Sequence, residues 1–266
     1  MASSSSSSYI PDERSKAGRL PKRTQYDYNL VHTILNETPI LHVSFNTPPP
    51  PPQQQHQQEG QPQFPTILPM LGAVATYASD PEPSLYLHGS SVARLFRLTK
   101  GSELPLCVCG TLLDGYVLAL APFHNSCNFR SAIVYGRGSI VNDPEEVHFA
   151  LRLITNNSIP DRWENSRAPP TKAEITSTGV LKVRIETASA KTRTGGPADD
   201  KADLENPHVS NNTWTGVVPA YTVLGDPIAA DSNKVRQVPE YLDDWVQDVN
   251  SMNEQRAIDA VEASAH

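Results

Sequence analysis

Cysteine, basic charge and long apolar runs are all scarce in this 266-residue sequence. Its three cysteines, Cys107, Cys109 and Cys127, are too few and odd in number for a disulfide framework, which favours a reducing, cytoplasmic compartment. No apolar run approaches the roughly 20 residues that span a bilayer. The N-terminal segment MASSSSSSYIPDERSK also lacks the apolar core of a secretory signal. The sequence therefore predicts a soluble protein with no membrane partner.

The charge balance is acidic, with 22 Lys and Arg against 29 Asp and Glu and a formal net charge of −7. A protein that binds nucleic acid through its phosphates needs clustered Lys and Arg instead. The basic cluster at residues 14–23 is short and weakly specific as a nuclear signal. We therefore expect no nucleic-acid partner.

Three stretches have compositions that differ from a packed domain. Residues 1–18 are a Ser-rich leader that we expect to be disordered, and residues 239–266 form an acidic segment with helical spacing. Residues 46–63, NTPPPPPQQQHQQEGQPQ, favour extended polyproline and offer nothing apolar to bury. Strand-like patterns resume directly after them, and loop closure costs rise slowly with length. We interpret this stretch as a long loop inserted in one domain, residues 19–238.

Strand-like alternation dominates that domain and predicts about six strands. The runs are PILHVSF, FPTILPMLGAVATY, LYLHG, PLCVCGTLLDGYVLALA, RSAIVYGRGSIV, TGVLKVRIETASAK and WTGVVPAYTVLG. Asp114-Gly115 predicts a hairpin turn within the fourth run. Helices are predicted after the N-caps Asp27 and Asp143 and in PTKAEITS, residues 170–177. The order of elements favours a mostly β, α+β domain or barrel with antiparallel strands and helices at its edges.

One strand ends in residues suited to an anion. In LYLHGSSVAR, residues 85–94, Gly89, Ser90 and Ser91 offer backbone N–H groups and hydroxyls just before a helix start. Arg94 could add a planar, charged fork to the same anion. The alternative is a tight turn with a solvated arginine, and this stretch alone does not decide between them.

Further fragments supply groups of the same kind. NFRS at 128–131 places an arginine beside an aromatic residue and a hydroxyl, and SAKTRTGGP contributes Lys191 and Arg193. NNTWTGVVP adds a flat aromatic, Trp214. Together these are the groups that a nucleotide-like ring on a phosphate tail requires.

The fragments RLPKR, LYLHGS, FHNSCNFRSAIVYGRG, SAKTRTGGP and WTGVVP, in this order, resemble a known family. It is the pyridoxamine 5′-phosphate oxidase-like FMN-binding split-barrel family, in the flavin-nucleotide-binding branch that includes the 5-nitroimidazole-resistance proteins. The resemblance covers roughly residues 19–228 without the Pro/Gln loop. It implies a six-stranded antiparallel split β-barrel with peripheral helices, which dimerises and holds FMN at the subunit interface.

The resemblance also assigns site residues. Those matching the cofactor-binding blocks are His88, Gly89, Ser90, Arg94, Asn128, Phe129, Arg130, Ser131, Lys191, Arg193 and Trp214. The sequence departs from the family at Ala93, where a serine is usual, and at Asn125 and Phe129 in the middle block. No arginine follows Trp214 in TGVVPAYTV, so the signature of true pyridoxamine-phosphate oxidases is missing and vitamin B6 synthesis is not expected.

The implied function is an FMN-dependent oxidoreductase that reduces a small, electron-poor substrate with NAD(P)H. His88 is the catalytic candidate because an imidazole titrates near neutral pH, and the alternative is a structural histidine. A second hypothesis is a non-catalytic flavin or haem carrier or sensor, with His124 or Cys127 as axial ligand. A third is a protein-interaction module built on the polyproline loop. No metal site is predicted, since Cys107 and Cys109 lack further ligands at zinc spacing.

Overall fold

The computed structural model describes residues 8–47, 64–78 and 80–263. They form two compact units that alternate along the chain. Unit 1 contains the described residues of 1–16, 26–110 and 132–190, and unit 2 contains those of 17–25, 111–131 and 191–266. Each unit is therefore discontinuous in sequence. The predicted single domain over residues 19–238 stays a prediction.

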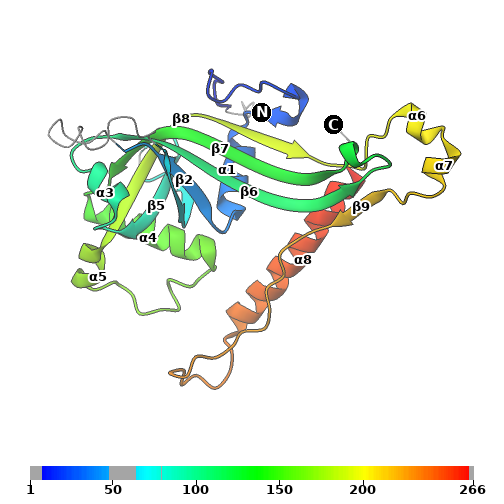
Figure 1. The fold of residues 1–266 in the computed structure, drawn as a ribbon. Coiled ribbons are helices and arrows are strands. Elements are labelled where there is room, and N and C mark those ends of the chain that lie inside the picture. The colour runs from blue at the N-terminus through cyan, green and yellow to red at the C-terminus, as the bar shows by residue number, and fades with distance from the viewer. Residues whose placement is uncertain (1–7, 48–63, 79, 264–266) are drawn as a thin grey trace, which may run out of the picture. The chain divides into compact units, whose positions relative to one another are not determined.

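One sheet of nine strands is present in the described residues, in the order β3-β2-β6-β7-β8-β5-β4, with β1 paired to β8 and β9 to β6. The strands are β1 (Thr24–Gln25), β2 (Leu41–Phe45), β3 (Thr66–Met70), β4 (Gly72–Ala75), β5 (Ser84–Ser90), β6 (Leu104–Leu118), β7 (Ser126–Ile140), β8 (Thr178–Arg193) and β9 (Gly216–Pro219). In Figure 1, β6, β7 and β8 are long neighbouring strands. The registers of β2–β3, β2–β6, β4–β5, β5–β8 and β6–β9 are antiparallel. The predicted α+β class with a large antiparallel sheet is confirmed.

The number of strands differs from the predicted six. The run FPTILPMLGAVATY forms two strands, because the extended structure is interrupted at Leu71. β3 pairs with β2, whereas β4 pairs with β5. The two-residue β1 is too short to show alternation in the sequence. Within unit 1, β3 and β5 also approach each other, as the closing of a barrel requires.

The predicted helices are present. They begin after side-chain caps because the first backbone N–H groups of a helix lack partners: Asp27 caps α1 (Tyr28–Glu37), Asp143 caps α4 (Pro144–Ser158) and Thr171 caps α5 (Lys172–Ser177). The other helices are η1 (Pro21–Arg23), α3 (Arg94–Leu98), η2 (Pro122–His124), α6 (Lys201–Leu204), α7 (Pro207–Ser210) and α8 (Glu240–Glu262). No helix among these described residues has the length and apolar character needed to cross a membrane.

Unit 1 contains two apolar clusters. The larger one buries Val31, Ile34 and Leu35 of α1 against strand residues such as Leu41 and Leu87. The smaller one packs α4 against β4 and β5, with Ala150 and Ile154 beside Tyr86. Burying these side chains supplies the main stabilisation of unit 1.

The Asp114-Gly115 pair does not form the predicted hairpin turn. Both residues lie inside β6, where Gly115 pairs with Pro219 of β9. The Asp114 side chain is only 3 % exposed and accepts hydrogen bonds from Arg130 on β7. A turn residue would keep its carboxylate in water, whereas this one is held in the sheet by an arginine.

The long-loop hairpin is confirmed where the structure describes it. β2 pairs with β3 from Leu41↔Met70 to Phe45↔Thr66. Of the predicted loop at 46–63, residues 48–63 lie outside the described residues. The strand pattern on either side of the Pro/Gln stretch was therefore a reliable signal.

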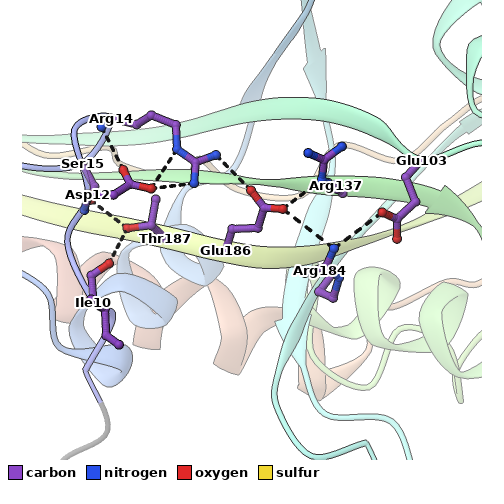
Figure 2. A network of polar contacts seen from close by, with 9 residues as sticks. All are labelled: Ile10, Asp12, Arg14, Ser15, Glu103, Arg137, Arg184, Glu186 and Thr187. Carbon is purple, nitrogen blue, oxygen red and sulfur yellow. Dashed lines mark hydrogen bonds and ion pairs between the residues drawn. The ribbon is translucent and has the colours of Figure 1, made fainter.

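Residues 8–16 are packed, which corrects the expected disordered leader for this part, while residues 1–7 lie outside the described residues. Tyr9 is buried, and its hydroxyl lies 2.6 Å from Nε2 of His32. Figure 2 shows the Arg14 guanidinium donating to Asp12 and to Glu186 of β8. Ser15 is also buried and hydrogen-bonded to Thr187. The Ser-rich composition of the leader did not indicate that Tyr9, Arg14 and Ser15 would contact the domain.

Candidate functional site

The first group of predicted cofactor residues lies at the end of β5 in unit 1. His88, Gly89 and Ser90 close the strand, and Arg94 is the first residue of α3. The predicted passage from strand to helix is therefore correct. The residues between them form a turn.

The glycine of this segment has a packing role. Gly89 pairs with Gly179 of β8, and both face the ring of Phe96 from α3. A Cβ at Gly89 would lie 2.9 Å from Phe96 Cε2, and one at Gly179 would lie 2.4 Å from Cδ1. The bare backbone thus makes room for an aromatic ring.

Two groups of this segment remain available to an anion. Arg94 is exposed, and within the described part of the chain its guanidinium has no hydrogen bond or ion pair. Ser90 is also exposed, whereas Ser91 uses its N–H and hydroxyl on the carbonyls of Ser177 and Thr176. Ala93 caps α3 without a side-chain bond. The available donors are therefore one arginine fork and one hydroxyl.

His88 is half-buried and lies opposite Val180 in the sheet. Burial lowers its pKa below the ordinary value of 6.5, because a charged ring is less well solvated there. Its ring nitrogens have no hydrogen-bond partner among the described residues. His88 is thus a neutral imidazole at pH 7, free to accept or donate one hydrogen bond.

The second group lies in unit 2, where Asn128 and Arg193 contact each other directly. Arg193 donates from Nη1 to the amide oxygen of Asn128, and Asn128 donates to the carbonyls of Gly195 at 3.1 Å and Ala260 at 3.3 Å. Ala260 belongs to the last turn of α8, whose carbonyls have no partner inside the helix. Asn128 therefore binds the last turn of the C-terminal helix, and Arg193 binds Asn128.

Arg193 is buried without a carboxylate beside it in the described structure. It is 5 % exposed, and its other hydrogen bonds go to the carbonyls of Gly195 and Gly196. Burial, and then the charge of Arg23, lower its pKa below the ordinary value. The guanidinium of Arg193 is thus already engaged in hydrogen bonds within the protein.

The remaining predicted residues of unit 2 differ in whether their side chains already have hydrogen-bond or ion-pair partners. Arg130 is paired with Asp114, with Nη2 and Oδ1 2.9 Å apart, and Ser131 donates to the carbonyl of Lys191. The Lys191 amine has no hydrogen bond or ion pair within the described residues. Phe129 is half-buried and Trp214 is exposed. Lys191 is therefore the available cation of this group.

The structure brings together Asn128 with Arg193 and Ser131 with Lys191, and it joins His88, Gly89, Ser90 and Arg94 in one segment. The assignment of all eleven residues to a cofactor stays a prediction. Sequence reasoning missed Asp114, although an acid in an apolar strand is a signal that a cation lies nearby.

A second missed cluster lies in unit 1. The Lys182 amine donates to Asp80 and Glu146, each at 2.7 Å, and the Tyr86 hydroxyl donates to Glu146 at 2.7 Å. Burial and then the hydrogen bond to Glu146 raise the pKa of Tyr86 well above its ordinary value. The cluster ties α4 to β5 and β8, and no sequence spacing links its members.

Residues 27–192 match the family model for pyridoxamine 5′-phosphate oxidase. The chain belongs to this family. The match spans β2 to β8 and includes the predicted residues from His88 to Lys191, whereas Arg193, Trp214 and α8 lie beyond its end. No curated protein sequence matches the chain.

Solved structures of similar proteins extend beyond the family match. The flavocytochrome Anf3 from Azotobacter vinelandii is 29 % identical, covers 89 % of this chain and 98 % of its own, and gives a TM-score of 0.71. An FAD and heme binding protein from Mycobacterium smegmatis is 25 % identical, covers 84 % of this chain and 97 % of its own, and gives a TM-score of 0.67. A Bacteroides thetaiotaomicron structure described as a 5-nitroimidazole antibiotic resistance protein is 19 % identical over 63 % of this chain and 85 % of its own, with a TM-score of 0.45.

Proposed function

We propose that this pyridoxamine 5′-phosphate oxidase-family protein is a flavin-binding oxidoreductase that also binds haem, as a flavocytochrome does. The observation that carries the proposal is its similarity to the Azotobacter flavocytochrome over 89 % of this chain and 98 % of the other. The similar mycobacterial protein is described as binding FAD and heme. Two such proteins, each matched along nearly its whole length, favour a pair of redox cofactors over a flavin alone.

The donors on β5 and α3 fit the phosphate of a flavin nucleotide. Arg94 offers an unpaired, exposed guanidinium and Ser90 a hydroxyl, and a planar fork suits phosphate oxygens. In unit 2, Lys191 is a separate cation without a partner in the described structure. Arg130 and Arg193 fit this role less well, because Asp114 and backbone carbonyls already engage their guanidinium groups.

When bound, a flavin supplies hydride and electron transfer, and the protein supplies orientation and proton handling. His88 fits proton handling, because burial keeps the ring neutral at pH 7 and its nitrogens have no partner among the described residues. We propose that His88 donates or accepts a proton at a ring nitrogen while a small, electron-poor substrate is reduced with NAD(P)H. FMN remains our choice of flavin from sequence, and FAD is the alternative that the mycobacterial relative favours.

Haem iron needs an axial ligand such as His, Cys, Met or Tyr. Cys127 is a free, half-buried thiol in the described structure, so it fits the requirement. His124 fits less well, because carboxylates of Asp200 and Asp203 lie beside its ring, where a porphyrin would have to fit.

The first test is the visible absorption spectrum of the purified protein, followed by chromatography of the cofactors that denaturation releases. We expect flavin bands together with a sharp Soret band, and the flavin released identifies FMN or FAD. A flavin spectrum without haem would leave the flavin-dependent reductase and remove the flavocytochrome. A colourless protein that also fails to bind added flavin and haem would overturn the proposal.

The phosphate assignment has its own test in two neighbouring arginines. Arg94→Ala should weaken flavin binding at least about tenfold, because a charge-assisted bond to phosphate is lost. Arg97→Ala is the matched control, since Arg97 is also exposed on α3 and has no partner among the described residues. Equal flavin affinities for both variants would remove Arg94 from the site.

We also propose a cytoplasmic homodimer. Its three cysteines are free, as a reducing compartment allows. In unit 2, Tyr116 of β6 and Val218 of β9 are cross-strand partners and both are exposed, so this face offers apolar surface to a second copy. Light scattering coupled to gel filtration should give about twice the chain mass of 29.1 kDa, and a single chain mass would refute the dimer.

A further inference from the structure

A histidine and two aspartates from separate segments of unit 2 lie close together. His124 ends η2, in the connection between β6 and β7, and Asp200 and Asp203 lie at the start of α6. One ligand atom from each residue can be chosen so that all three atoms lie within 4.8 Å of one another. Nε2 of His124 is 3.8 Å from Oδ2 of Asp200.

One further hydrogen bond joins the two segments, and another lies within the β6–β7 connection. The carboxylate of Asp199 accepts the N–H of Leu120 at 2.7 Å, and the side-chain oxygen of Asn125 accepts the N–H of Ala119 at 2.7 Å. His124 therefore lies in a turn that these hydrogen bonds fix, and one of them comes from Asp199, which directly precedes Asp200. The juxtaposition does not depend on attraction between the imidazole and the acids.

Nδ1 of His124 is unusual in the described structure. It is the one buried side-chain nitrogen or oxygen there without a hydrogen-bond partner. Buried polar atoms normally have partners because leaving one unpaired is costly. The other ring nitrogen, Nε2, lies near Asp200. Nε2 is therefore the nitrogen placed to coordinate a metal ion.

The charges around the cluster are also unbalanced. The Asp203 carboxylate has no hydrogen bond or ion pair among the described residues, and the intervening Lys201 pairs with Glu205 at 3.4 Å. Of the two carboxylates, that of Asp200 is the one paired with the imidazole, at 3.8 Å. An ion pair between His124 and Asp200 would neutralise only one of them and only when the ring is protonated, whereas a divalent cation neutralises both.

From this geometry we infer that His124, Asp200 and Asp203 bind a divalent transition-metal ion such as Zn²⁺. Ligands about 2.1 Å from a tetrahedral ion lie about 3.4 Å apart, so the cluster has to close by about 1.5 Å or less. One nitrogen and two carboxylate oxygens suit zinc, whereas Mg²⁺ and Ca²⁺ prefer oxygen ligands throughout. Three protein ligands leave further positions on the ion for water. The ion links the β6–β7 connection to α6 and does not depend on flavin or haem.

Calorimetry with Zn²⁺ on the full-length protein, previously dialysed against EDTA and then against buffer, tests the site. We expect one strong site, weakened about tenfold or more by His124→Gln, Asp200→Asn or Asp203→Asn. His208→Gln, which changes an exposed histidine in the same unit, is the control and should bind Zn²⁺ like the parent. Circular dichroism of each variant shows that it is folded.

Trypsin provides a second readout that does not rely on affinity. Lys201 lies between the two aspartates and is 85 % exposed, so Zn²⁺ should slow cleavage after Lys201 several-fold. Cleavage after Lys234, in an exposed loop of the same unit, should not change, which controls for inhibition of trypsin. Asp203→Asn should abolish the protection.

Three results would overturn the inference. They are no Zn²⁺ binding by the parent protein, equal affinity of the parent and the three ligand variants, and equal effects of Zn²⁺ at both trypsin sites. Binding that Asp200→Asn and Asp203→Asn weaken but His124→Gln does not would also overturn it, because the imidazole would then not be a ligand.

Discussion

Replacing Asn128 with alanine separates a structural role from a cofactor role at a predicted site residue. The side chain is fully buried and makes three hydrogen bonds, two donated to the carbonyls of Gly195 and Ala260 and one accepted from Arg193. Each bond to a neutral carbonyl contributes about 1 kcal/mol, and the bond from the guanidinium about 2 kcal/mol. Asn128→Ala should therefore lower the free energy of unfolding by about 4 kcal/mol.

The assay is urea denaturation followed by circular dichroism, with and without bound flavin. The control is Ser131→Ala, on the same strand, which loses one hydroxyl bond to the carbonyl of Lys191 at 3.2 Å and should cost about 1 kcal/mol. Limited proteolysis should also release α8 faster in Asn128→Ala, because Asn128 holds its last turn. An unchanged free energy of unfolding combined with lost flavin affinity would refute the reasoning and return Asn128 to the cofactor.

Three further changes have defined outcomes. Gly179→Ala should lower the free energy of unfolding by about 1–3 kcal/mol by overpacking, since its Cβ would lie 2.4 Å from the Phe96 ring; adding Phe96→Leu should recover part of it, and no recovery would contradict the clash. Arg130→Ala should cost about 3–5 kcal/mol in urea denaturation, because it leaves the buried Asp114 carboxylate unpaired, and a cost below about 1 kcal/mol would count against the pair. Burial lowers the pKa of His32 below 6.5. The unfolded chain therefore takes up a proton at His32 at a higher pH than the folded protein does, and the free energy of unfolding should decrease as the pH falls from about 7.5 to 5.5. His32→Asn should make this dependence on pH less steep, and an unchanged dependence would be evidence against a neutral ring.

The sequence predicted those parts of the fold that depend on local patterns. The N-caps Asp27 and Asp143 are short-range features, and the helices formed where these caps predicted them. The hairpin around the Pro/Gln stretch was also predictable, because alternation was present on both sides of it. Local chemistry was sufficient in each case.

The errors arose where distant contacts override local preference. Asp114-Gly115 is a favourable turn pair, but Arg130 and β9 keep it in an extended strand. Tyr9 lies in a Ser-rich leader, and contacts with distant residues such as His32 and Tyr28 make it part of the core. The sequence close to Asp114 or Tyr9 does not indicate these distant partners.

The site residues show the same limit. The family resemblance assigned Gly89, Asn128 and Arg193 to the cofactor, and that assignment stays a prediction. In the structure Gly89 makes room for Phe96. Asn128 donates to the last turn of α8, and Arg193 donates to Asn128. Residue type alone does not distinguish a donor aimed at a ligand from one used by the protein itself.

The register of the β2–β3 hairpin makes the protein convenient to engineer. Phe45 and Thr66 are direct partners across the two strands, so any chain that joins them starts and ends at almost the same point. A peptide tag, a fluorescent domain or a pair of new termini could replace the native connection without changing the sheet on either side. The same position allows a reporter to be attached to the protein without using either end of the chain.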